Sequence, residues 1–145
     1  MATVTVRGEE VWRRIRERLG KKALVRAGVP EGATYPDGKS VAGAAAVQEF
    51  GGPNIPPRPF LRRTYRTYNR AWIERLARML QHGRPPDAAL EEIGRTMMAD
   101  IQATIDDSPG WAEPDSELTL ARKESDKPLY HTGALRGAID YEVAE

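Results

Sequence analysis

The stretch VQEFGGPNIPPRPFLR, from Val47 to Arg62, separates a short region of mixed helix and strand patterns from a region with the patterns of two long helices. Its prolines Pro53, Pro56, Pro57 and Pro59 remove backbone donors and push the residues before them toward extended geometry. We therefore expect a stiff spacer here, and neither a helix nor an inner strand. Proline-rich peptide ligands have a similar composition, but the segment is short and lies between two expected helices, which favours the structural spacer.

Two long helices are expected after this spacer. Apolar residues recur at steps of three and four from Phe60 to Gln81, and again after Pro86 and Asp87, which together suit a helix start. The short connection between the two helices predicts an antiparallel pair. The expected apolar stripe of the first helix consists of Leu61, Tyr65, Tyr68, Trp72, Leu76 and Leu80, and that of the second consists of Leu90, Ile93, Met97, Ile101 and Ile105.

Shorter elements are expected before the spacer. Thr3–Arg7 alternates β-branched and polar residues, as an edge strand does, whereas Glu9–Leu19 has the period of a helix. Ala23–Val29 is typical of a second strand. Ser40 can cap a helix that extends to Glu49 and ends at the glycines that follow.

The chain after the second long helix is polar and punctuated by prolines, so a long loop is expected from Ser108 to Ser125. Thr132 can then cap a short helical turn that carries Leu135, and Ala138–Val143 alternates like a closing strand. Together these patterns predict a single α+β domain over residues 1–145. In it, a small antiparallel sheet packs against two long helices and several short ones, with a long irregular loop before the C-terminal strand.

The composition excludes several classes of protein. The 145 residues suit one domain with a modest core, and 40% hydrophobic and 30% charged residues fit neither a disordered tail nor a membrane protein. No apolar run approaches the roughly 20 residues of a membrane-spanning helix, and the first residues do not have the pattern of a secretory signal. Because the sequence contains no cysteine, disulfides and thiolate metal sites are excluded, which fits synthesis in a reducing cytoplasm.

The net charge of +1 conceals opposite charges in the two halves of the chain. Residues 1–83 contain 16 Lys or Arg and 7 Asp or Glu, whereas residues 84–145 contain 6 and 14. The bland interpretation is two solvated faces that differ in charge. The other interpretations are pairing within the chain, contact with nucleic acid, and head-to-tail assembly in which one subunit's basic face meets the next subunit's acidic face.

No constellation of catalytic or metal-binding residues can be assembled from the sequence. His82 is expected at a helix end, where it can cap a carbonyl group, and His131 in a loop, and neither has a ligand partner at helical spacing. The adjacent carboxylates Glu91–Glu92 and Asp106–Asp107 would point about 100° apart on a helix, so we interpret them as solubilising. Phosphate-loop, dinucleotide, zinc-protease and serine-hydrolase motifs do not occur. We therefore expect no enzyme, no cofactor and no metal site.

Three ordered stretches carry a resemblance to a known family. They are Gln48–Gly51, Ile55–Arg62, and Ala121–Lys123 together with Asp126–Leu135. In combination they resemble the tail-completion or neck proteins of long-tailed bacteriophages, which are also described as virion morphogenesis proteins. A proline-rich loop or a Thr-Gly-x-Leu turn is common by itself, so the ordered combination carries the resemblance. The loop from Ser108 to Ser125 departs from the family pattern because it is acidic and contains Trp111.

The resemblance implies a structural virion protein that is made in the host cytoplasm and assembles into a ring at the head–tail junction, with a hexamer as the expected size. Its expected partners are further copies of itself, the neighbouring head-connector protein and the tail-tube or tail-terminator protein, with transient contact to DNA in the lumen. Catalysis, a cofactor and a membrane are not expected. The expected contact residues are Glu49, Phe50, Pro57, Arg58, Pro59, Phe60, Arg62, Arg66, Arg70, Trp111, Leu129 and Thr132.

The first long helix supports two hypotheses of different class. In the first, Arg62, Arg66 and Arg70 approach acidic residues of an adjacent subunit or of a partner ring. In the alternative, the basic helix from Arg58 to Arg78 binds the phosphates of a nucleic acid, as the fork geometry of arginine allows. Because the expected aromatic stripe lies away from the arginines, base stacking is not indicated, and a solvated basic face is preferred to this alternative.

Overall fold

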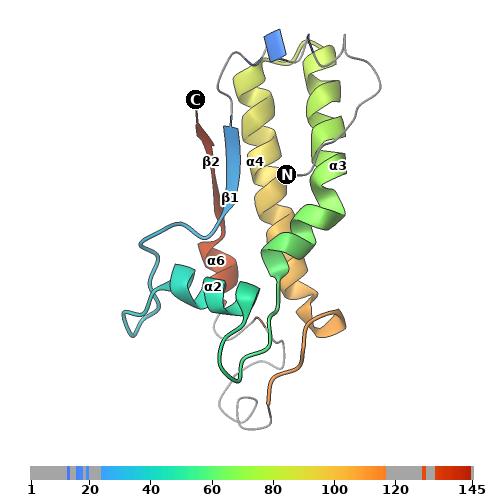
Figure 1. Cartoon of the computed structure of the whole chain (residues 1–145). Helices are drawn as coiled ribbons and strands as arrows, with labels where there is room; N and C mark the ends of the chain where they lie inside the picture. Colours follow the sequence, from blue (N-terminus) through green and yellow to red (C-terminus); the bar gives the residue numbers. More distant parts are fainter. Residues whose placement is uncertain are drawn as a thin grey trace.

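The computed structural model describes residues 13, 16, 17, 19, 24–116, 129 and 133–144. In order along the chain its elements are β1 (Leu24–Gly28), α2 (Val41–Phe50), α3 (Phe60–Gln81), α4 (Pro86–Asp106), the 3-10 helix η1 (Ser108–Gly110), α6 (Ala134–Ala138) and β2 (Asp140–Ala144). Figure 1 shows the two strands on one flank of α4 and α3 on the other, with α2 and α6 near one end of the long helices. The expected α+β fold is confirmed.

The sheet of the described residues is a single antiparallel pair. Its register runs from Leu24 opposite Ala144 to Gly28 opposite Asp140. Side chains alternate between the two faces of a strand, and Tyr141 points toward α4, where its ring lies against Gly94. The sheet therefore packs on α4 with one face and leaves its other face exposed.

Helix α2 forms as its sequence predicts. The Ser40 side chain accepts a hydrogen bond from the Gly43 amide at 3.0 Å, which satisfies one of the donors left free at a helix start. Val41, Ala45 and Glu49 are buried at steps of four residues and form the inward face. The helix ends at Gly51, whose φ of 77° is a left-handed conformation that favours glycine.

Helices α3 and α4 form the expected antiparallel pair (Figure 1). The bounds of α3 agree with the expected range, and α4 begins at Pro86 as predicted. In α4, Leu90, Ile93 and Ile101 are buried together with Ile105, so most of its expected stripe faces the core. None of the helices in the described part of the chain is both long and apolar enough to cross a membrane.

The inward face of α3 differs from the expected stripe. Tyr65 is 47% exposed, whereas Phe60 and Thr64 are buried. Thr64 can face the core because its hydroxyl donates to the Phe60 carbonyl at 2.7 Å and lies 2.7 Å from the Thr104 hydroxyl of α4. A polar residue that satisfies its hydrogen bonds internally can replace an apolar one in the core, which is why the apolar pattern pointed to the wrong face at this end.

The C-terminal elements agree with the prediction except at one boundary. Leu135 is buried on α6, and β2 follows, but Ala138 ends α6 and the strand starts only at Asp140. Residues 13, 16, 17 and 19 are helical, in agreement with the expected N-terminal helix. The expected strand Thr3–Arg7 and residues 117–125 of the expected loop lie outside the described residues, and so do His131 and Thr132.

Two apolar clusters hold the ends of the α3–α4 pair. The larger one contains Phe60, Ile101 and Ile105, with Val41, Ala45, Leu129, Leu135 and Ile139 from the shorter segments around them. The smaller one, at the connection between the long helices, consists of Leu80 and Ala89 with partly buried neighbours. The segment quoted at the start therefore joins α2 to α3 beside the larger cluster.

Candidate assembly site at the elbow

The segment from Gly51 to Pro59, which we call the elbow, turns the chain sharply between α2 and α3. Gly52 and Ile55 exchange two backbone hydrogen bonds of 3.0 Å. A side chain at Gly51 would lie only 3.0 Å from the Ile55 carbonyl and 3.1 Å from the Pro57 nitrogen. The elbow thus depends on a glycine at this position and on prolines that restrict the return path, as the expected stiff spacer requires.

Arg58 is buried beneath the elbow rather than exposed on a basic helix. Its Nε donates to the Glu113 carbonyl at 2.7 Å, and its terminal nitrogens donate to Gln48 Oε1 and to the Pro114 carbonyl, each at 3.1 Å. It also forms an ion pair of 3.3 Å with Asp115, and both side chains are only 6% exposed. This one guanidinium therefore fastens α2 and the elbow to the segment that follows η1.

Glu49 caps α3 from a different helix. Pro59 supplies no side-chain cap to α3, but the buried Glu49 carboxylate accepts from the backbone N–H groups of Leu61 at 2.9 Å and Arg62 at 3.0 Å. Arg62 Nε adds a third bond of 2.8 Å to the same carboxylate. A negative charge at a helix N-terminus is favourable, so Glu49 fixes the angle at which α3 leaves the elbow.

We call the buried contacts of Arg58 and Glu49 the polar frame. An apolar patch lies on the surface beside this frame. Phe50 is 70% exposed, Val47 is 38% exposed and Ile55 is 39% exposed. Gly52, which is bonded to Ile55, lies beside Val47, so the three side chains belong to one surface that we call the Phe50 patch. The Arg62 guanidinium stands 5.1 Å from the centre of the Phe50 ring, within the range of a cation–π interaction.

The expected contact residues divide into buried and exposed groups. The buried group, which has its partners within this chain, consists of Glu49, Arg58, Phe60 and Leu129. Trp111 is partly buried, donates to the Thr104 carbonyl and lies under the Arg63 guanidinium. The more accessible group consists of Phe50, Pro57, Pro59, Arg62, Arg66 and Arg70, with Pro59 partly covered. Contact with another protein is thus open to the second group.

Sequence reasoning missed both the partners of Arg58 and the apolar members of the patch. Asp115 stood in a stretch without periodicity, and no local pattern links it to an arginine far away in the sequence. Val47 lies at the start of the proline-rich spacer and Ile55 lies within it, and no sequence pattern there indicates that their side chains are exposed. The family resemblance did indicate part of this arrangement. Its stretches Gln48–Gly51 and Ile55–Arg62 contact each other through Arg58 and Glu49.

Three further titratable residues that the sequence singled out serve structural contacts: His82, Glu91 and Glu92. His82 Nδ1 lies 2.7 Å from the Arg78 carbonyl, as expected for a residue that caps a helix end. The interpretation of Glu91–Glu92 as merely solubilising is wrong, since Tyr141 donates to Glu91 and both Arg75 and Arg84 pair with Glu92. The Arg75 hydrogen bond, with the charges of both arginines, lowers the pKa of Glu92. No group of three or more metal-binding side chains converges among the described residues.

Comparison with known proteins leaves the chain without an assigned relative, since no family model, no curated protein and no solved structure matches it.

Proposed function

We propose that this chain is a structural subunit of a bacteriophage virion, which assembles into a ring at the head–tail junction and joins the tail to the head. The observation that carries the proposal is the Phe50 patch. A phenylalanine with 70% of its surface exposed at the end of a well-fixed helix leaves apolar area in water that a partner protein would cover. Large aromatic side chains of this kind are common anchors of protein interfaces.

The rigidity of the frame supports this role. Buried ion pairs and hydrogen bonds of Glu49 and Arg58 hold the backbone on both sides of the patch. A surface that is already ordered loses little conformational entropy when it binds. The residues of the resemblance to phage neck proteins thus build the support, and the exposed side chains beside them make the contact.

The position of the patch suggests which partner it meets. The elbow lies near one end of the long helices, whereas the sheet and α3 form the flanks (Figure 1). In a ring, flanks face neighbouring copies, and ends face the rings above and below. We therefore assign the Phe50 patch to the contact with a neighbouring head-connector or tail protein.

The experiment is genetic complementation in the phage whose genome encodes the chain. Deleting its gene should leave heads and tails that fail to join, visible by electron microscopy. The wild-type gene should restore infectious particles that contain the chain, and a Phe50→Ser variant should restore few. Phe50→Trp is the matched control, because it keeps a large aromatic side chain at the same exposed position and should restore infectious particles. Particles that join normally without the chain would overturn the proposal.

Nucleic-acid binding by α3 is the second candidate, and the exposed Arg66 and Arg78 favour it. The five other arginines of the basic segment are already engaged. Arg63 lies over Trp111, and the other four pair with carboxylates: Arg58, Arg62, Arg70 and Arg75. Fewer charges are then left for phosphates than the sequence implied. Duplex DNA titrated at low salt tests it, because phosphate contacts give an affinity that falls steeply with added salt. Absence of binding at low salt removes this candidate.

A further inference from the structure

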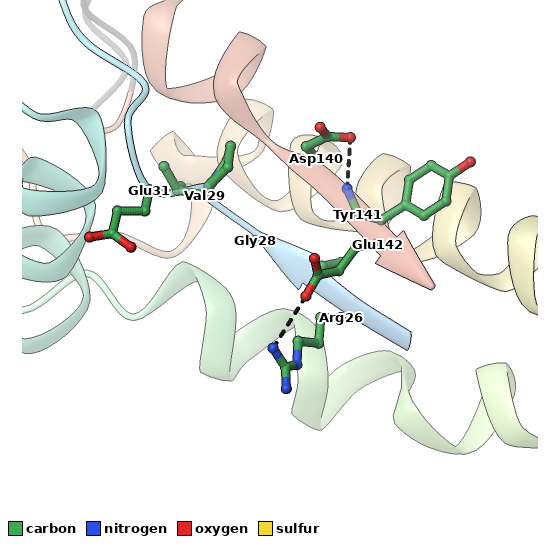
Figure 2. A pocket seen from close by; sticks show the side chains of 9 residues that line it. Arg26, Gly28, Val29, Glu31, Asp140, Tyr141 and Glu142 are labelled. Carbon is green, nitrogen blue, oxygen red and sulfur yellow. Dashed lines mark hydrogen bonds and ion pairs between the residues drawn. The ribbon is translucent and has the colours of Figure 1, made fainter. Parts of the chain in front are cut away.

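The exposed face of the sheet contains a hollow that is bordered by both strands. The hollow has a volume of about 500 Å³ and lies where β1 ends and β2 begins. Figure 2 shows Glu31, Asp140 and Glu142 around it, with Arg26 beside Glu142. Gly28 lies opposite Asp140 in the register, and open space stands where its side chain would be. We call this surface the acidic hollow.

The charges of the hollow are only partly balanced. Three carboxylates and one guanidinium border it, and the guanidinium of Arg26 is committed to Glu142 at 3.2 Å. Asp140 accepts one hydrogen bond, from the Tyr141 backbone. In the part of the chain that the structure describes, neither Glu31 nor Asp140 has a cationic side chain within ion-pair distance. The hollow is therefore negative and open to solvent.

The exposed side of α3 has the opposite charge. This helix contains six arginines and one glutamate, Glu74. Arg62 and Arg75 are paired with carboxylates of α2 and α4, but Arg66 has no carboxylate partner among the residues that the structure covers. Arg70, one turn further along, meets only the exposed Glu74 at 3.3 Å. We call Arg66 and Arg70 the arginine strip.

We propose that the arginine strip of one copy docks on the acidic hollow of a second copy, so that α3 of each subunit lies against the sheet of the next. The contact rests on the proposed ring function, because it is the lateral contact that would build the ring. Guanidinium groups reaching Glu31 and Asp140 would form charge-assisted hydrogen bonds. The docked helix would also cover the face of the sheet that α4 leaves exposed.

The charges of the two surfaces, which do not pair with each other within the described part of one chain, favour contact with a second copy. α4 packs against both α3 and the strands (Figure 1), and Arg66 of α3 borders one pocket together with Ala27 of β1. Within the described part of one chain, however, no ion pair joins Arg66 or Arg70 to Glu31 or Asp140, and Arg70 is paired with Glu74. Two strips facing each other in a two-fold dimer would repel, whereas strip to hollow is complementary. Such a head-to-tail contact leaves a free strip and a free hollow at the ends, and it closes as a ring when the rotation allows.

Charge reversal tests the contact, read by native mass spectrometry over a concentration and salt series. We expect Arg66→Glu with Arg70→Glu, and separately Glu31→Arg with Asp140→Arg, to weaken self-association about a hundredfold, because like charges then face each other. Combining all four substitutions, or mixing the two double variants, should restore it. Recovery on mixing is specific to a contact between a strip and a hollow. Arg78→Glu with Arg95→Glu is the control of equal charge change, on exposed residues outside the strip, and should associate like the wild type.

A disulfide test detects the contact even when association is weak. The chain has no cysteine, so Arg70→Cys combined with Glu31→Cys introduces the sole thiols, and oxidation should give a ladder of multimers. Arg95→Cys with Glu31→Cys is the control and should give no comparable ladder. A wild-type ring with charge variants that assemble normally would overturn this contact and leave the proposed function standing. If the wild-type chain did not self-associate and the variant with Arg70→Cys and Glu31→Cys gave no ladder, the contact and the ring would be overturned together.

Discussion

At the elbow end of the molecule, the Arg58–Asp115 ion pair is enclosed, with each side chain 6% exposed. At the opposite end of the same two long helices, Arg75 and Arg84 meet Glu92 while 45% and 43% of the arginine side chains remain exposed. The elbow is held by a few directional contacts of buried charges. We call the end where α3 connects to α4 the hairpin end. It is held by apolar packing around Leu80 and Ala89, and its ion pairs remain partly exposed.

The difference in burial of these ion pairs shows which end of the long helices can tolerate substitutions. A buried charge that loses its partner is left without solvent or counter-charge, which is far more costly than losing an exposed pair. The elbow therefore specifies one geometry for the Phe50 patch, whereas the charges at the hairpin end can vary with small effects on the fold. Four substitutions, taken from the largest expected effect to the smallest, test this contrast.

Removing the buried guanidinium should have the largest effect. Arg58→Met removes the buried ion pair with Asp115 and the donors of two backbone carbonyls, and we expect the free energy of unfolding to fall by about 3–5 kcal/mol. Arg26→Met is the matched control, because its pair with Glu142 is more than 60% exposed on both sides, and it should cost at most about 1 kcal/mol. Urea unfolding of both variants measures the difference. Equal losses would remove the distinction between the two kinds of ion pair.

The cap supplied by Glu49 should rank second. Glu49→Ala leaves the Leu61 and Arg62 amides without their acceptor, and we expect a loss of about 2–3 kcal/mol. Hydrogen exchange should become faster at those two amides and not along the rest of α3. Ser40→Ala removes the cap of α2 and serves as the control, with an expected cost of about 1 kcal/mol. If α3 amides kept their protection, another group would have to cap the helix.

The elements of the fold could be predicted from the sequence where structure is local. The bounds of α3 and the Ser40 cap follow from periodicity and capping chemistry within a few residues. The face that α3 buries could not be predicted, because one of the two groups that satisfy the buried Thr64 hydroxyl is the Thr104 hydroxyl, 40 residues away. Apolar patterning treats such a threonine as an outward residue.

The frame of the candidate site was less predictable for the same reason. Arg58 and Glu49 were identified as special, but they were expected to contact other subunits. Their partners, the Glu113 carbonyl and the Leu61 amide, belong to segments that meet only after folding. The sequence does not show whether a charged residue is buried. It could therefore indicate that Arg58 and Glu49 are important, but not that their partners lie within the same chain.

The contact between α4 and the sheet provides the third test, because it depends on close packing instead of charge. An added Cβ at Gly94 would overlap the Tyr141 ring, and the hydrogen bond from the Tyr141 hydroxyl to Glu91 holds that ring in place. Gly94→Ala should therefore cost about 1–3 kcal/mol, although the same change in an open helix is stabilising. Gly137→Ala in α6 meets no atom within 4 Å and should be neutral or stabilising. Thermal unfolding of both variants measures the contrast.

Glu92 should show the smallest effect, and one that depends on pH. Its pKa is lowered in the folded chain from an ordinary value of 4.5, mainly by the Arg75 hydrogen bond. A lowered folded pKa means that the charged carboxylate stabilises the fold above pH 4.5, and that this contribution is lost as the pH falls through the folded pKa. Glu92→Gln should thus lower the melting temperature slightly at neutral pH, and the difference from the wild type should vanish in acid.

High salt should also shrink the Glu92→Gln difference at neutral pH, because the arginine partners are exposed and their attraction is screened. Glu74→Gln is the control, since its pair with Arg70 is largely exposed within one helix, and its difference should be smaller still. If the Glu92→Gln loss persisted unchanged in acid and in salt, Glu92 would stabilise the hairpin end through its packing. The ion pairs at that end would then contribute even less to the stability of the fold than we expect from the comparison with the buried Arg58–Asp115 pair.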